Sequence, residues 1–155
     1  MAFTGSPVDS VQRALGLANK TEPRDAAKLY CRYANYTHAA GAGTGEINMF
    51  TLPPGRIRIY PDLCRYMASA NGAAAMLHIG HRAYADESGT AVAEDDNEWL
   101  DNLDITSAVD AAWGDGATTL NQYESQSGIV VFITIDAQDL ADDDTFQLLC
   151  VFAYL

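Results

Sequence analysis

The sequence predicts a mostly β domain, and three observations support this fold class. Short segments in which apolar and polar residues alternate recur along the chain, about seven to eight in all. Turns rich in Gly and Pro separate them, and no helical pattern alternates with them. The length of 155 residues suits one domain with its own core. Together these observations predict an antiparallel β-sandwich with a jelly-roll-like topology.

Residues 1–25 differ from the rest and are expected to form an N-terminal arm or a short helix, followed by a β-sandwich domain over residues 26–155. Ser6 would cap a helix that has Pro7 at its first position. A thin apolar stripe would then lie on one helical face, formed by Val8, Val11, Leu15 and Ala18. Because so thin a stripe needs a partner surface, an extended arm is the alternative.

The clearest alternation is Arg56-Ile57-Arg58-Ile59-Tyr60, with its isoleucines expected to point inward and its arginines outward. Residues 129–135 carry almost no polar side chain, which is typical of a central strand buried on both faces. Between residues 93 and 113 the pattern fits either a short helical turn or a strand. Further strands are expected at residues 28–37, 47–52, 63–67, 75–84 and 146–154.

Charge is divided unequally along the chain, whose formal net charge is -12. All nine Lys and Arg lie between Arg13 and Arg82, and residues 1–82 contain five acids, which gives this part a balance of +4. Residues 83–155 hold the other sixteen acids and no Lys or Arg, a balance of -16. This division indicates that the two parts meet different surroundings or meet each other, unless the acids only keep the protein soluble. The acidic part disfavours nucleic acid as a partner.

The three cysteines, Cys31, Cys64 and Cys150, are far apart and form no CxxC pair. We expect reduced thiols packed as small hydrophobic side chains within strands, with one disulfide as the alternative. The longest apolar stretch, at residues 128–135, is much shorter than the ~20 residues of a membrane span. The N-terminus has neither the basic nor the apolar region of a secretory signal. No membrane partner is therefore expected.

No group of residues has the spacing of a catalytic, metal or cofactor site. His78 and His81 would point to opposite faces of a strand and could share an ion only if Gly80 formed a bulge. The acidic run at residues 94–98 lacks the spacing of a calcium-binding loop and is expected to be a solvated loop. The Gly-rich segment at residues 41–45 lacks the Lys of a phosphate-binding loop. We therefore expect a protein that is not an enzyme and holds no cofactor.

Aromatic residues are expected mainly in the core. Tyr30, Tyr33 and Tyr36 lie in the first expected strand, and they could instead form a cluster at an interface, where Tyr is favoured. Trp99 and Trp113 would mark a carbohydrate site if they were exposed, although we expect both to be buried.

Several segments follow one another from about residue 45 to the end: FTLPPGRIRI at 50–59, LHIGHRAY at 77–84, DDNEWLDNLD at 95–104, and YES at 123–125 before the strand at 129–135. This succession of turns and strand edges resembles the small structural proteins of tailed-bacteriophage heads, of the decoration or cement type. It carries no catalytic signature.

The resemblance implies a virion protein on the outer face of the capsid, made in the host cytoplasm, that holds neighbouring capsomers together. Its partners would be the major capsid protein and copies of itself, often in a homotrimer, without nucleic acid, membrane or cofactor. Under this hypothesis Arg13, Lys20, Arg24 and Lys28 grip an acidic shell surface or a neighbouring subunit. A tail or connector component, and a carbohydrate- or receptor-binding module, are the alternatives.

Overall fold

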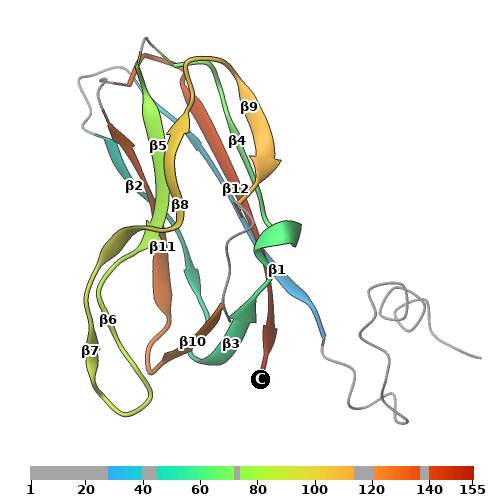
Figure 1. Cartoon of the computed structure of the whole chain (residues 1–155), viewed down its shortest axis with the longest axis vertical. Helices are drawn as coiled ribbons and strands as arrows, with labels where there is room; N and C mark the ends of the chain where they lie inside the picture. Colours follow the sequence, from blue (N-terminus) through green and yellow to red (C-terminus); the bar gives the residue numbers. More distant parts are fainter. Residues whose placement is uncertain (1–27, 40–44, 72–73, 114–120, 137–139) are drawn as a thin grey trace, which may run out of the picture.

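The computed structural model describes residues 28–39, 45–71, 74–113, 121–136 and 140–155, and these form a two-layered β structure (Figure 1). They contain twelve strands and one short 3-10 helix, η2 (Pro61–Leu63). The predicted arm or helix of residues 1–25 lies outside the described residues. In the part of the chain that is described, no helix has the length and apolar character needed to cross a membrane.

One layer, sheet A, is built around the last strand of the chain. It contains β1 (Tyr30–Thr37), β3 (Gly55–Ile59), β4 (Arg65–Ala68), β9 (Val109–Ala112), β10 (Gln122–Ser125) and β12 (Thr145–Tyr154). Strand β1 pairs with one side of β12, while β3 and β4 pair with the other side, one near each end. Strands β3 and β4 are therefore two parts of one strand position, separated by η2. Strand β10 pairs with β3 and β9 pairs with β4, so β10 and β9 are likewise two parts of the next strand position.

The second layer, sheet B, has four strands. Their order is β2 (Gly45–Leu52), β11 (Ile129–Asp136), β5 (Met76–His81) and β8 (Asp95–Asp104). A two-stranded ribbon of β6 (Tyr84–Ala85) and β7 (Ala91–Val92) connects β5 to β8 and extends beyond the end of the sandwich (Figure 1).

The strand pairs follow the order of a long hairpin that has been rolled up. The first strand position pairs with the last, β1 with β12, and the second pairs with the second-to-last, β2 with β11. The two parts of the third position, β3 and β4, pair with β10 and β9, and β5 pairs with β8 at the tip. Two sheets made in this way from eight strand positions form a jelly roll. The predicted antiparallel β-sandwich with jelly-roll-like topology is therefore confirmed.

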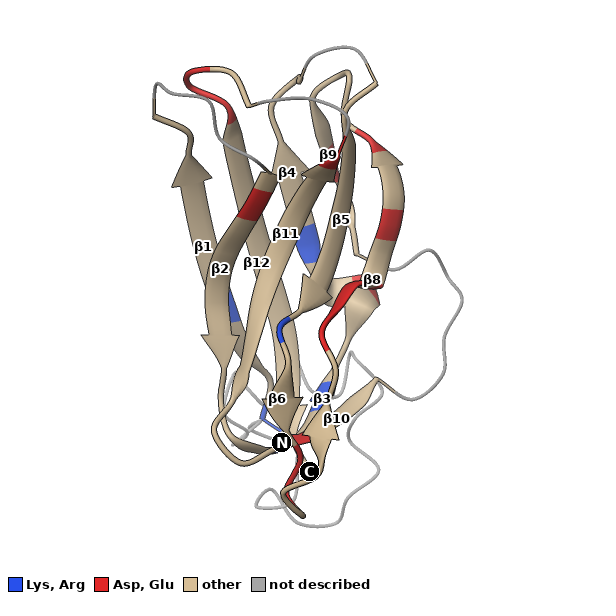
Figure 2. Cartoon of the chain, turned by 90° about the vertical axis from the view of Figure 1, so that its left-hand side faces the viewer, with Lys and Arg blue, Asp and Glu red and all other residues tan. Residues whose placement is uncertain are grey.

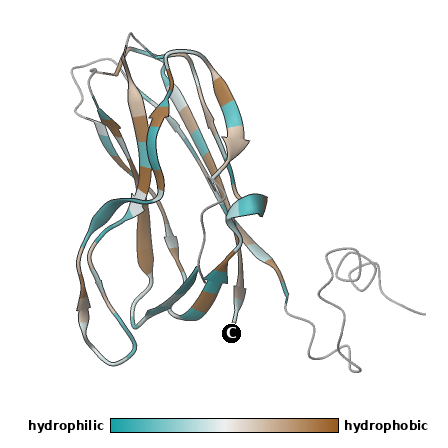
Figure 3. Ribbon diagram, in the orientation of Figure 1, coloured by the Kyte–Doolittle hydropathy of each residue, from teal (hydrophilic) through white to brown (hydrophobic). Residues whose placement is uncertain are grey.

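The core lies between the sheets, where each strand contributes alternate residues. On β12 the buried side chains are Phe146, Leu148, Cys150 and Phe152, and the residues between them are only partly buried. Ile57 and Ile59 of β3 are buried as predicted from their alternation. Hydropathy colouring shows hydrophobic segments along β11 and β12 and hydrophilic residues in the β6–β7 ribbon (Figure 3).

Strand β11 was expected to be buried on both faces, and the structure confirms this. It lies inside sheet B between β2 and β5. Ile133, which faces the core, is fully buried, and so is Phe132, which faces outward. Arg82 covers the outward-facing ring of Phe132, and its guanidinium carbon lies 3.9 Å from the centre of that ring.

The ambiguous stretch at residues 93–113 forms strands β8 and β9 rather than a helical turn. The acidic run at 94–98 was expected as a loop, and this was wrong, because all but its first residue belong to β8. The register between β5 and β8 shifts on both sides of Ile79, which indicates bulges. Bulges displace the period-2 alternation, so apolar residues such as Trp99 and Leu103 acquire a spacing that is also typical of a helix.

The prediction for the cysteines was only partly correct. All three are free thiols, and Cys64 and Cys150 are buried, but Cys31 is exposed on β1. Cys64 lies between η2 and β4 rather than within a strand, and its Sγ accepts a hydrogen bond from the Val151 backbone N–H at 3.2 Å. A hydrogen bond with Cys64, together with burial, raises the pKa of the Cys150 thiol. The Cys150 thiol therefore acts as a packing group.

Candidate interaction surface

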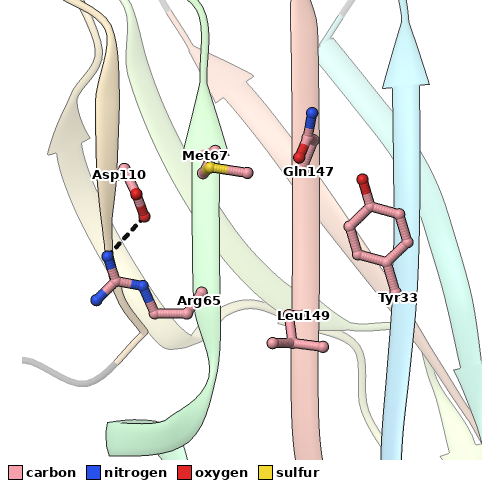
Figure 4. A pocket seen from close by; sticks show the side chains of 6 residues that line it. All are labelled: Tyr33, Arg65, Met67, Asp110, Gln147 and Leu149. Atoms are coloured by element: carbon pink, nitrogen blue, oxygen red, sulfur yellow. Dashed lines mark hydrogen bonds and ion pairs between the residues drawn. The ribbon is translucent and has the colours of Figure 1, made fainter.

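The outer face of sheet A carries a shallow hollow, which is shown in Figure 4. Its centre is apolar, because Leu149 of β12, Met67 of β4 and Tyr33 of β1 all occupy strand positions that point away from the core. Gln147, Arg65 and Asp110 complete the lining, and the enclosed volume is about 250 Å³. An ion pair between Arg65 and Asp110, with a 2.6 Å separation of nitrogen and oxygen, closes one side.

The apolar residues of this hollow are accessible to a partner. Tyr33 keeps 59% of its surface exposed and Met67 keeps 39%, and Leu149 is partly buried beside them. Exposed apolar residues that gather on one face are typical of contact surfaces. Tyr33 was predicted from the sequence as an interface residue, whereas Met67 and Leu149 were not. The alternation of apolar and polar positions in their strands was the signal that could have identified Met67 and Leu149 as outward-facing.

The three predicted interface tyrosines do not form one cluster, so that part of the hypothesis was wrong. Tyr33 faces the hollow. Tyr30 and Tyr36 lie three residues away on either side, and because successive side chains of a strand alternate, both point to the opposite side of β1. Tyr30 is 41% exposed and stacks on Phe152 with the ring centres 5.8 Å apart. The Tyr36 hydroxyl lies 3.1 Å from Nδ1 of His38.

The basic residues fall into two groups. Three of them form ion pairs with acids distant in the sequence: Arg56 with Glu124, Arg65 with Asp110, and Arg82 with Glu46 and Glu94. In the described residues, Lys28, Arg32 and Arg58 form no hydrogen bond or ion pair within the subunit. Of the predicted shell-gripping residues, Lys28 is exposed just before β1, and Arg13, Lys20 and Arg24 lie outside the described residues.

The structure places the two kinds of charge mainly on different sheets (Figure 2). The strands of sheet A carry four arginines and two acids, a balance of +2. The strands of sheet B carry seven acids and no Lys or Arg, a balance of -7. The acids in sheet B are Glu46, Asp95, Asp96, Glu98, Asp101, Asp104 and Asp136. The unequal charge along the chain is therefore also an unequal charge between the two sheets.

His78 and His81 point to opposite sides of β5, as predicted, and each has structural contacts. Nδ1 of His78 lies 3.0 Å from a carboxylate oxygen of Asp101, and Nε2 lies 3.3 Å from one of Asp136. Both acids come from neighbouring strands and lie far from His78 in the sequence. His81 packs inside, edge-on to Tyr84 and Trp99. Among the described residues, no group of three or more His, Cys, Asp or Glu could hold a metal ion.

Neither tryptophan marks a carbohydrate site, because both are buried as expected. Trp99 donates a hydrogen bond from Nε1 to the Tyr123 hydroxyl at 2.7 Å, and that hydroxyl donates to Glu98 at 2.7 Å. Burial, reinforced by the Glu98 carboxylate, raises the pKa of Tyr123. Trp113 donates to the Arg65 carbonyl at 2.9 Å. The bonds fix both indole rings within the core.

Replacing Arg82 by Ala is expected to lower the free energy of unfolding by about 2 kcal/mol. The guanidinium covers Phe132 and also joins Glu46 to Glu94, so its loss exposes the ring and leaves two like charges close together. Urea denaturation would measure the effect. Arg58→Ala is the matched control, because Arg58 has no ion pair, and it should change stability by less than about 0.5 kcal/mol. Equal effects of the two changes would contradict this role of Arg82.

Comparison with known proteins identifies likenesses of fold. No model of a known protein family matches the sequence, and no curated protein matches it. The chain is similar to one in the capsid asymmetric unit of cyanophage Pam1, with a TM-score of 0.52 and 12% identity over 100% of both chains.

Two other solved structures also match. One is infectious bursal disease virus strain Gx, with a TM-score of 0.48 and 13% identity, covering 83% of this chain but only 32% of that one. The other is the virus-like particle of the extra small virus of the prawn Macrobrachium rosenbergii, with a TM-score of 0.32 and 14% identity over 100% and 95%. At these identities, the likeness to the Pam1 chain shows that this protein has a fold found in a phage capsid.

Proposed function

We propose that this chain is a structural protein of a bacteriophage particle, of the type that decorates the outer capsid surface and joins neighbouring capsomers. One observation carries the proposal. The jelly roll matches a chain of the cyanophage Pam1 capsid over the full length of both chains. A fold alone does not define a function. The exposed hollow on sheet A adds a surface suited to protein contacts.

The polar clusters favour a structural role over catalysis. His78 lies between two carboxylates on the outer side of sheet B, and His81 packs among aromatic rings. The Glu98–Tyr123–Trp99 chain of hydrogen bonds joins β8 to β10 across the core. Each cluster thus holds strands together.

Within this proposal, the major capsid protein and further copies of the chain are the partners, and a homotrimer is the expected assembly. The basic side chains Arg13, Lys20, Arg24 and Lys28 would attach the protein to an acidic shell surface. Lys28 is exposed and without an ion pair at the start of the described domain, which leaves its charge available.

Particles stripped of this protein provide the direct test. Purified protein is added to stripped virions of the phage that encodes it, and binding is followed by co-sedimentation and cryo-electron microscopy. We expect saturable binding at fixed positions on the outer surface. Absence of the protein from intact virions, as measured by mass spectrometry, would refute the proposal. Binding to a glycan array in that case would support the carbohydrate- or receptor-binding alternative.

Deleting residues 1–25 is expected to abolish binding to the stripped particles while the domain stays folded. The reason is that three of the four basic side chains proposed to grip the shell lie in this segment, namely Arg13, Lys20 and Arg24. The same co-sedimentation assay measures the loss, and circular dichroism checks the fold. A triple change of these residues to Gln is the matched test of charge. Unchanged affinity of the deletion variant would show that the arm has no part in attachment.

A further inference from the structure

We propose that copies of this chain associate through two different faces, with the outer face of sheet A of one copy docked on the acidic outer face of sheet B of the next. The inference deepens the proposed function, because it names the surfaces through which neighbouring copies would meet. It concerns association in solution, so it can be tested without capsids.

Sheet A supplies the apolar part of such a contact. Its hollow of about 250 Å³ has Tyr33, Met67 and Leu149 at the centre, and the first two are among the most exposed large apolar residues described. Interfaces combine an apolar centre with a polar rim. The Arg65–Asp110 ion pair and Gln147 provide that rim within the subunit.

Sheet A also supplies positive charge that the subunit does not neutralise. Arg58 points outward on β3 opposite Gln122, and its side chain forms no hydrogen bond or ion pair with any residue that the structure describes. Its Nε is buried without an acceptor. A buried N–H without a partner costs free energy that a carboxylate from outside would recover. Arg32 on β1 is also exposed and unpaired within the described residues, but it lies opposite the buried Cys150 of β12 and therefore on the other side of the sheet.

The complementary surface is present on the same chain. The strands of sheet B carry seven acids without a Lys or Arg among them. Within the described part of the chain, Asp96 is exposed without a side-chain hydrogen bond or ion pair, and Asp136 forms an ion pair with His78 alone. A second copy therefore offers the carboxylate that Arg58 lacks. Opposite potentials on two faces direct which faces meet.

Such a contact is heterologous, because the two copies use different surfaces. Heterologous contacts close into rings when the rotation between copies allows it. Repeated around an axis, the contact would generate the homotrimer expected for the proposed function. Contact of sheet A with itself would instead give a two-fold dimer with its cations facing one another.

Two variants with reversed charge on one face each provide the test. R58E reverses the charge of the unpaired arginine on the outer face of sheet A, and D96K/D136K makes sheet B less acidic. Analytical ultracentrifugation at low salt should show the wild-type chain associated, and each variant alone should associate more than about tenfold more weakly. An equimolar mixture should associate again, because each variant then finds an opposite face on the other. The control E87K/D142K changes charge at two exposed positions outside both sheets and should behave as wild type.

Three results would overturn the inference. They are a wild-type chain that stays monomeric at low salt, unchanged association of D96K/D136K alone, or a mixture that fails to associate. Unchanged association of D96K/D136K would indicate that sheet A pairs with itself. Circular dichroism verifies that each variant is folded. If the copies did not associate but the protein still bound stripped particles, this inference would be wrong and the proposed function would stand. If the copies associated but did not bind particles, the proposed function would be wrong and this inference would stand.

Discussion

Replacing Gly80 by Ala is expected to lower the free energy of unfolding by about 3 kcal/mol or more. Gly80 lies in β5 where the backbone of β8 passes close to it. A Cβ atom at this position would overlap the carbonyl oxygen of Asp95 and lie 2.6 Å from the Cα of Asp96. Both are backbone atoms and cannot move without separating the strands, so the pairing of β5 with β8 would be lost locally. Urea denaturation and hydrogen exchange of β8 amides would measure this.

Gly89→Ala is the matched control for that change. Gly89 has a φ of +85°, and a Cβ there would meet only the side-chain amide of Gln126 at 3.6 Å. Gly89→Ala should therefore lower the free energy of unfolding by about 1 kcal/mol, and only because alanine disfavours this backbone conformation. If Gly80→Ala cost no more than Gly89→Ala, close approach of the β8 backbone would not be the reason for glycine at position 80.

Trp99→Ala is expected to cost about 4 kcal/mol of stability, the second large effect. The indole ring contacts Tyr123, His81 and Trp113 with ring centres 5.6 to 5.7 Å apart. Its removal leaves a large cavity between the sheets and takes away a hydrogen-bond donor to the Tyr123 hydroxyl. The midpoint of urea denaturation would report the loss.

Two further variants separate packing from hydrogen bonding at this position. Tyr123→Phe keeps the ring but leaves the Trp99 N–H without its acceptor, so it should cost about 1 to 2 kcal/mol. Leu63→Ala, at an exposed position, should change stability by less than about 0.5 kcal/mol. A loss for Trp99→Ala as small as that for Leu63→Ala would be inconsistent with a core role for the indole.

Sequence reasoning performed best where local alternation was undisturbed. The inward isoleucines of β3 were predicted correctly, because neighbours along a strand point to opposite sides whatever lies above them. Burial of β11 on both faces was predicted correctly from its lack of polar side chains. Sequence reasoning failed where bulges displace the pattern. The acidic residues at the start of β8 were assigned to a loop, since their charges resemble those of loops and the register shift beside Ile79 leaves no local signal.

The candidate site was harder to predict, because its residues come from four strands. Tyr33 was named for its residue type, but its neighbours Met67 and Leu149 are brought beside it only by the pairing of β1 and β4 with β12. The carboxylates beside His78 were missed for the same reason. Asp101 is 23 residues away in the chain, and Asp136 lies on β11.

The sequence by itself determined the fold class, the position of the central buried strand and the separation of basic from acidic residues along the chain. These properties follow from composition and short-range periodicity. Only the tertiary structure decided that the separation also divides the two sheets, that a hollow lies outside sheet A, and that the predicted tyrosine cluster does not exist. The physical reason is that strand order joins distant segments into faces, and long-range backbone pairing sets that order.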